Sequence, residues 1–161
     1  PMSASKESSA ASDVYKRQGE GCTNEDVIEA VEWVVPSIEL IDSRIKDWKI
    51  TLRDTIADNA SSCGWILGEQ RVPISAIDTG DIDATLHRNG EVVAKGNSSA
   101  VLGHPLNAVS WLARKVAGFG VRLRKGDVIL PGTATRAIDI DAGDHFVAEF
   151  AGLGSVTLDF D

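Results

Sequence analysis

The chain of 161 residues is long enough for one domain with a hydrophobic core, and 43% of its residues are hydrophobic. Its formal net charge of -8 disfavours binding to nucleic acid and to anionic membrane surfaces. No apolar run approaches the ~20 residues that span a bilayer, and the start of the sequence lacks the apolar core of a secretory signal. The two cysteines, Cys22 and Cys63, do not make a disulfide framework. We therefore expect a cytoplasmic protein.

The first 18 residues differ in composition from the rest of the chain. They are rich in Ser, Ala and Lys and lack apolar periodicity. Such a segment cannot bury enough apolar surface to fold. We expect residues 1–18 to be a disordered or non-native leader and residues 19–161 to form the domain.

The first element of the domain is predicted to be a helix that follows Thr23. Thr23 suits the N-cap position, and Asp26 three residues later completes a capping box. Apolar residues then recur at helical spacing: Val27, Ala30, Val31 and Val34. Pro36 ends this pattern, because the residue before a proline avoids the helical conformation.

A second helix is predicted to begin at Pro105, a residue type favoured at the first helical position. Its apolar stripe consists of Leu106, Val109, Leu112, Ala113 and Val116. Gly118 or Gly120 would end it. His104 lies just before the helix, where it could act as an acid or base near neutral pH. It could equally cap the helix.

Strands are predicted for the remaining apolar segments. Residues 37–41 suit a strand with Ile38 and Leu40 on one face and Glu39 on the other. A short buried strand is predicted at 65–67. Further strands are predicted in a hairpin over 83–95 that turns at Asn89-Gly90, and at 128–130, 145–150 and 156–158. Because strands outnumber helices and must pair over long sequence distances, the pattern indicates an α+β fold.

Glu39 is the first candidate metal ligand. It has apolar neighbours on both sides, and a buried unpaired carboxylate costs several kcal/mol unless it is neutralised or meets a cation. Carboxylate oxygens suit magnesium or manganese. The alternative is an ion pair with a nearby basic residue such as Arg44.

A dense cluster of small polar residues occupies positions 54–62. It could form a polar wall that binds a carboxylate or a metal-bound water, with Asp58 and Asn59 as the best candidates. It could also be a helix cap or a tight turn, because Asp, Asn and Ser readily bond to the local backbone.

A third candidate is the segment 131–136, which follows an apolar run. Its small and hydroxyl residues would let backbone N–H groups face a ligand, and Arg136 could hold a carboxylate through two hydrogen bonds. The alternative is a simple exposed turn.

Several of these segments together resemble the 2-keto-4-pentenoate hydratases of the fumarylacetoacetate hydrolase superfamily. The resemblance runs in family order from about Gly19 to the C-terminus. It is carried by VEWVVP at 31–36, Glu39 with Asp42, Ser43, Arg44 and Ile45, Asp47-Trp48, DTIADNASS at 54–62, VLGHPLNAV at 101–109 and GLGSV at 152–156.

The resemblance implies an α+β fold with a mixed sheet rolled on itself and flanking helices, incomplete at the N-terminus. It implies a divalent metal, Mg²⁺ or Mn²⁺, held by three carboxylates, of which Glu39 matches the third. It also implies hydration of 2-hydroxypenta-2,4-dienoate to 4-hydroxy-2-oxopentanoate in the bacterial meta-cleavage breakdown of aromatic compounds. A 2-oxo acid can chelate such a cation, which stabilises the enolate formed during the reaction.

Site roles and partners follow as further expectations. Asp58, Asn59 and Ser61 are candidate catalytic residues of the pocket wall, and Thr133, Thr135 and Arg136 are candidate residues for binding the substrate carboxylate. The expected partner is a small 2-oxo or 2-hydroxy dienoic acid, with neither nucleic acid nor membrane, in a homo-oligomer.

The chain also departs from the family pattern. Family members carry a Glu-x-Glu pair that supplies the other two metal ligands, and a lysine in a Lys-x-Gly-Leu-Thr type segment; neither is present here. We therefore expect an N-terminally truncated hydratase that is a poor catalyst alone. One alternative is 4-oxalocrotonate decarboxylase, which shares the fold and the metal. The other is a non-catalytic oligomerisation or binding module.

Overall fold

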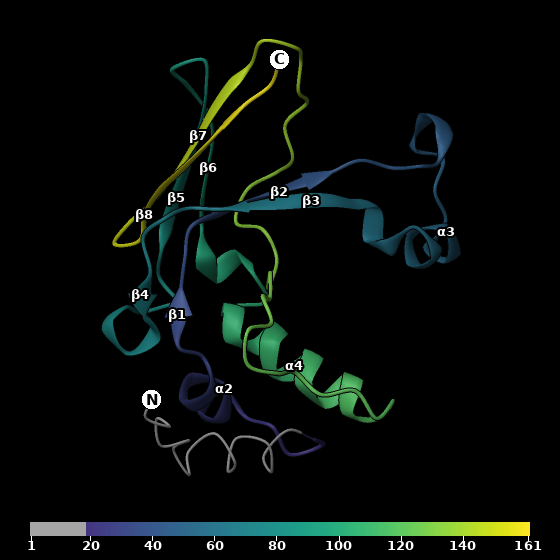
Figure 1. Ribbon diagram of the computed structural model, residues 1–161, viewed down its shortest axis with the longest axis vertical. Coiled ribbons are helices and arrows are strands. Elements are labelled where there is room, and N and C mark those ends of the chain that lie inside the picture. Colours follow the sequence, from purple (N-terminus) through teal and green to yellow (C-terminus); the bar gives the residue numbers. More distant parts are fainter. Residues whose placement is uncertain (1–18) are drawn as a thin grey trace, which may run out of the picture.

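The computed structural model describes residues 19–161, so the leader predicted at residues 1–18 lies outside the described part. Figure 1 shows the arrangement of its helices and strands. The helices are α2 (Asn24–Ala30), α3 (Leu52–Ala57) and α4 (Pro105–Ala117), and the strands are β1 (Trp33–Val34), β2 (Ser37–Ile41), β3 (Ser62–Leu67), β4 (Val72–Pro73), β5 (Asp83–Arg88), β6 (Glu91–Asn97), β7 (His145–Phe150) and β8 (Gly154–Asp159).

Four strands form the largest sheet, in the antiparallel order β6-β5-β7-β8. The predicted hairpin is confirmed: β5 and β6 are joined at Asn89 (φ 54°) and Gly90 (φ 85°). Two positive φ values are what a type I′ turn requires, which is why Asn-Gly is favoured there. The predicted strands at 145–150 and 156–158 are β7 and β8.

A separate two-stranded ribbon consists of β2 and β3, paired antiparallel with Glu39 opposite Trp65. It runs across the four-stranded sheet and carries α3 at its far end, away from the rest of the molecule (Figure 1). Both strands of the ribbon contact β8. The short strands β1 and β4 form a third sheet. The α+β class is therefore confirmed, and all the pairings among the described strands are antiparallel.

The main helical core lies between α2 and α4. Its buried residues are Cys22, Val27, Ile74, Leu106, Val109 and Ala113. The predicted capping box is present, with Thr23 and Asp26 bonded to each other's backbone. His104 caps α4, since its Nδ1 accepts a hydrogen bond of 3.1 Å from the backbone N–H of Leu106. This geometry supports the capping interpretation of His104.

Three expectations for the strands and helices were wrong. The strand predicted at 128–130 is absent, and residues 121–144 contain no helix or strand. The strand around Trp65 is not buried, because the Trp65 side chain is 47% exposed. The first helix ends at Ala30 and not near Pro36, because Trp33 and Val34 pair with β4 instead.

Both cysteines are free in the described chain: Cys22 is buried and Cys63 is exposed. Among residues 19–161 no helix is both long and apolar enough to cross a membrane.

Candidate functional site

A pocket of about 240 Å³ lies where β2, the inner face of the four-stranded sheet and the segment 130–140 meet. In Figure 1 this segment descends from the turn before β7, passes the β2–β3 ribbon and continues toward α4. Apolar side chains from the sheet line much of the pocket, among them Leu86, Phe146 and Phe150. Such a chamber suits the apolar part of a small organic ligand.

The polar side of the pocket brings together residues from distant parts of the sequence. Glu39 of β2 lines it with Thr133, Thr135 and Arg136. Arg136 is the one basic residue and Glu39 the one acidic residue among its described lining residues. The fold therefore gathers the metal-ligand candidate and the three carboxylate-binding candidates around one cavity.

Glu39 differs from expectation in its burial. The sequence predicts a buried carboxylate, but Glu39 is exposed. The reason lies in the tertiary structure: among the described strands β2 pairs only with β3, and Trp65 opposite Glu39 is itself half exposed. The alternative of an ion pair with Arg44 is also wrong, because the carboxylate partner of Arg44 is Asp58. Glu39 thus lines the pocket with its side chain exposed to solvent.

Thr133 holds the segment 131–136 in a local turn. Its hydroxyl donates to the backbone carbonyl of Thr135 at 2.9 Å and accepts from the backbone N–H of Thr135 at 3.3 Å. The hydroxyl proton is therefore already used within the segment. The Thr133 oxygen can still accept one further hydrogen bond. The Arg136 side chain is exposed to solvent.

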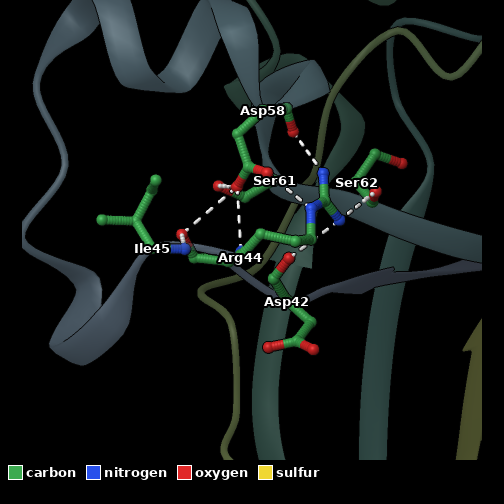
Figure 2. A network of polar contacts seen from close by, with 7 residues as sticks. Asp42, Arg44, Ile45, Asp58, Ser61 and Ser62 are labelled. Atoms are coloured by element: carbon green, nitrogen blue, oxygen red, sulfur yellow. Dashed lines mark hydrogen bonds and ion pairs between the residues drawn. The ribbon is translucent and has the colours of Figure 1, made fainter.

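Asp58 and Ser61 belong to a different group of contacts, shown in Figure 2. The Nε of Arg44 donates to the Asp58 carboxylate at 2.5 Å, and the backbone N–H of Arg44 donates to the same carboxylate at 3.1 Å. The hydroxyls of Ser43 and Ser61 donate to it at 3.3 and 3.4 Å. The remaining guanidinium nitrogens of Arg44 bind the carbonyls of Asp42, Asp58 and Ser62.

These contacts hold a strained turn in place. Asn59, Ala60 and Ser61 have φ values of 53°, 56° and 56°, in the left-handed region. This conformation costs non-glycine residues about 1–2 kcal/mol each. Burial disfavours ionisation of Asp58, but the hydrogen bonds from Arg44 outweigh it and lower the pKa of its carboxyl. Asp58 therefore stays charged and keeps its bonds to Arg44 across the neutral range.

Asp58, Asn59 and Ser61 are absent from the described lining of the pocket. The structure thus separates the seven predicted site residues into two groups. Four surround the cavity, and three lie at the end of α3, beyond the β2–β3 ribbon (Figure 1).

A polar cluster that sequence analysis missed anchors the end of the irregular segment 121–144. Arg88 on β5 binds both Asp141 and Asp144, each at 2.6 Å. Its guanidinium carbon lies 6.0 Å from the ring centre of Phe146, a pocket residue. Hydrogen bonds from Arg88 and from the backbone of Asp141 lower the pKa of Asp144 to about 2. The signal in the sequence was slight: a lone arginine before a hairpin turn.

The carboxylates of the described chain do not form a complete metal site. Within residues 19–161 no three His, Cys, Asp or Glu side chains gather closely enough to hold a metal ion. Magnesium takes about six oxygen ligands, several of which can be water or substrate. Glu39 fits the role of one such ligand, because it is exposed at the pocket and offers hard oxygen donors.

Comparison with known families identifies the fold. The model of the fumarylacetoacetate (FAA) hydrolase C-terminal family matches residues 13–160. The chain belongs to this family. A 2-hydroxyhexa-2,4-dienoate hydratase from Comamonas testosteroni is 41% identical over 143 residues, which is 89% of this chain and 54% of that protein. A 2-keto-4-pentenoate hydratase from Burkholderia vietnamiensis is 44% identical over 135 residues, which is 84% of this chain and 52% of that protein.

A solved structure is also similar to this chain in fold. It is 4-oxalocrotonate decarboxylase from Pseudomonas putida G7, complexed with magnesium and adipate, with a TM-score of 0.86 and 38% identity. The match covers 89% of this chain and 55% of the decarboxylase. The chain therefore spans about half the length of the relatives that it matches.

Proposed function

We propose that this chain carries the substrate-binding half of a hydratase that adds water to 2-hydroxypenta-2,4-dienoate and yields 4-hydroxy-2-oxopentanoate. The observation that carries the proposal is the meeting of Glu39 with Thr133, Thr135 and Arg136 around an apolar pocket. The identity of 41–44% with dienoate and pentenoate hydratases supports the same reaction. A place in the breakdown of aromatic compounds in the cytoplasm follows from this substrate.

The pocket suits a short monocarboxylate. Arg136 would bind the carboxylate through two charge-assisted hydrogen bonds, and the backbone of the 132–136 segment would orient it. The apolar side chains of Leu86, Phe146 and Phe150 would then surround the diene carbon chain and exclude water from it. A single basic side chain matches a single carboxylate.

Glu39 would hold a divalent cation, Mg²⁺ or Mn²⁺, beside this carboxylate. When bound, the cation supplies the positive charge that polarises the 2-oxo group of the acid. Its preferred ligands are carboxylate, carbonyl and water oxygens, and Glu39 is of this kind. The related decarboxylase structure is a complex with magnesium, which supports the choice of a divalent metal.

The decarboxylase reading is the second candidate, supported by the TM-score of 0.86 to 4-oxalocrotonate decarboxylase. Its substrate has two carboxylates, whereas the described pocket offers one basic side chain. We therefore place the hydratase first. Incubating the 161-residue chain and Mg²⁺ with each acid, and measuring 4-hydroxy-2-oxopentanoate or carbon dioxide, separates the two reactions.

Metal binding is tested by calorimetry, because a binding site can persist where turnover is low. We expect heat from Mg²⁺ that increases when 2-oxopentanoate is present, and loss of that heat in Glu39→Gln. Glu91→Gln, at the exposed start of β6, is the matched control and should bind as the wild type does. An absence of heat in the wild type would instead support a non-catalytic binding or oligomerisation module.

The catalytic role of Asp58, Asn59 and Ser61 is a separate proposal. Asp58 and Ser61 are engaged with Arg44 and with each other, so Asn59 is the sharper test. Loss of turnover in Asn59→Ala with unchanged 2-oxopentanoate affinity would support a catalytic group at this end of the ribbon. Unchanged turnover would remove the cluster from the site.

A further inference from the structure

Gly96 of β6 lies against the backbone of the pocket segment. A Cβ atom built at Gly96 would overlap with the carbonyl oxygen of Ala134 and would lie 2.7 Å from its carbonyl carbon. It would also lie 3.3 Å from Cγ2 of Thr135. The obstacle is main chain, which cannot rotate away as a flexible side chain can. Any residue larger than glycine at position 96 must therefore displace the segment.

A second glycine fixes the start of the same segment. Gly132 has a φ of 138°, and a Cβ there would lie 3.1 Å from Cγ1 of Val101. Val101 is buried and follows β6 by only a few residues. The pocket segment is thus held close to one continuous stretch of chain, 96–101, at two points on either side of Thr133.

The close approach reaches the pocket directly. Gly96 pairs with Ala84 on β5, and Ala84 lines the pocket beside Thr85. The residues that press on Gly96 and their neighbours, Thr133 to Arg136, line the same pocket. Because the Thr133 hydroxyl ties Thr133 to Thr135, a shift at Ala134 moves the turn as a unit. Arg136 is the next residue after Thr135, so it would move with the turn.

We propose that Gly96 is a positioning residue of the pocket. Because Gly96 has no side chain, residues 132–136 can lie close against the sheet, and this close packing positions Arg136 to bind the carboxylate of a ligand. The identity of that ligand, a short 2-oxo acid, rests on the proposed function. The placement of the segment does not.

The test is Gly96→Ala in the 161-residue chain, with two readouts. The first is hydrogen exchange of the amides in residues 131–137. We expect this exchange to become about tenfold faster because the segment is displaced from the sheet. The second is the Kd for 2-oxopentanoate in the presence of Mg²⁺, which we expect to rise about tenfold or more, because misplacing a binding group by about 1 Å can cost on the order of 10²-fold in the function that depends on its position.

Two controls separate positioning from general destabilisation. Gly64→Ala adds a Cβ to another strand glycine, where no atom lies within 4 Å, and both readouts should stay as in the wild type. Leu106→Ala weakens the core between α2 and α4 at a residue that is not among the described lining of the pocket. It should lower the unfolding midpoint while leaving the Kd unchanged.

The experiment distinguishes failure of this inference from failure of the proposed function. If the wild type binds no 2-oxopentanoate with Mg²⁺, the proposed function fails, and the exchange comparison still decides the role of Gly96. A folded Gly96→Ala protein with wild-type exchange at 131–137 and wild-type Kd overturns the inference. If Gly96→Ala does not fold, Gly132→Ala takes its place with the same expected result, and wild-type behaviour of that variant overturns it.

Discussion

Arg44 and Asp58 are joined by both the side chain and the backbone of the arginine, so one carboxylate links the loop after β2 to the C-terminal end of α3. The Nε–Oδ1 distance is 2.5 Å, and the backbone N–H of Arg44 adds a bond of 3.1 Å. The Asp58 side chain is 8% exposed, whereas that of Arg44 is 48% exposed. A buried carboxylate bound in this way requires the fork-shaped donor group of arginine.

We expect Arg44→Lys to lower the thermal unfolding midpoint by several degrees. Lysine keeps the charge, but a single ammonium group cannot reach the Asp58 carboxylate and the carbonyls of Asp42 and Ser62 together. Differential scanning calorimetry measures the effect. Arg53→Lys, in the neighbouring helix α3, is the matched control and should unfold as the wild type does. Equal midpoints for all three proteins would mean that the contacts of Arg44 do not hold the loop.

For the strained turn after Asp58 we predict a substitution that increases the stability of the protein. Ala60→Gly should stabilise the protein by up to about 1 kcal/mol, because glycine adopts a φ of 56° without the steric cost that alanine bears there. Ala57→Gly, three residues earlier at the last position of α3, should destabilise it by up to about 1 kcal/mol. Denaturation in urea measures both changes. A destabilised Ala60→Gly protein would show that the left-handed turn is absent in solution.

Asp144 should make stability depend on pH in the acidic range. Its pKa of about 2 in the folded protein lies below its ordinary value of 3.8, owing first to Arg88. A lowered folded pKa contributes stability that is complete above the ordinary pKa and is lost as the pH falls through the folded pKa. Asp144→Asn should therefore be less stable than the wild type at pH 7, and the difference should shrink between about pH 4 and pH 2.

Asp141→Asn is the control for this titration, since Asp141 also binds Arg88 but its side chain is 81% exposed, against 5% for Asp144. Exposed ion pairs contribute little to stability. Urea unfolding at a series of pH values should show only a small effect of Asp141→Asn. An Asp144→Asn protein with the same acid dependence as the wild type would assign that dependence to other carboxylates.

Local patterns in the sequence predicted the elements that depend on local chemistry. The Asn89-Gly90 turn, the Thr23 capping box and the start of α4 at Pro105 all follow from a few adjacent residues. The apolar stripe of α4 also predicted buried residues correctly, as Leu106, Val109 and Ala113 show. The family resemblance added the order of the segments along the chain.

Features that depend on packing between distant segments could not be predicted from local sequence patterns. The apolar neighbours of Glu39 predicted burial, yet burial requires a second layer, and the β2–β3 ribbon has an open face. Residues 128–130 have a strand-like composition but find no partner strand in the described chain. The role of Gly96 depends on the approach of Ala134 from a remote segment, and no local pattern encodes that approach.

For the His104 cap of α4 we predict that two substitutions at this position differ in their effect on the stability of the protein. His104→Ala removes the acceptor for the Leu106 N–H and should destabilise the protein by about 1 kcal/mol. His104→Asn keeps an acceptor at the cap position and should recover most of this loss. Urea denaturation compares the three proteins. If His104→Asn is as unstable as His104→Ala, the contribution of the ring is packing against Gly80 and not capping.

Thr133 should matter through its hydroxyl and not through its size. Thr133→Val keeps the shape but loses both hydrogen bonds to Thr135, each of which contributes about 1 kcal/mol. The turn that carries Arg136 should then loosen, with faster amide exchange at 131–137 and weaker 2-oxopentanoate binding. Thr133→Ser keeps the hydroxyl and should behave as the wild type does. If valine preserves exchange and binding while serine does not, the methyl group orders the turn in place of the hydrogen-bonded hydroxyl.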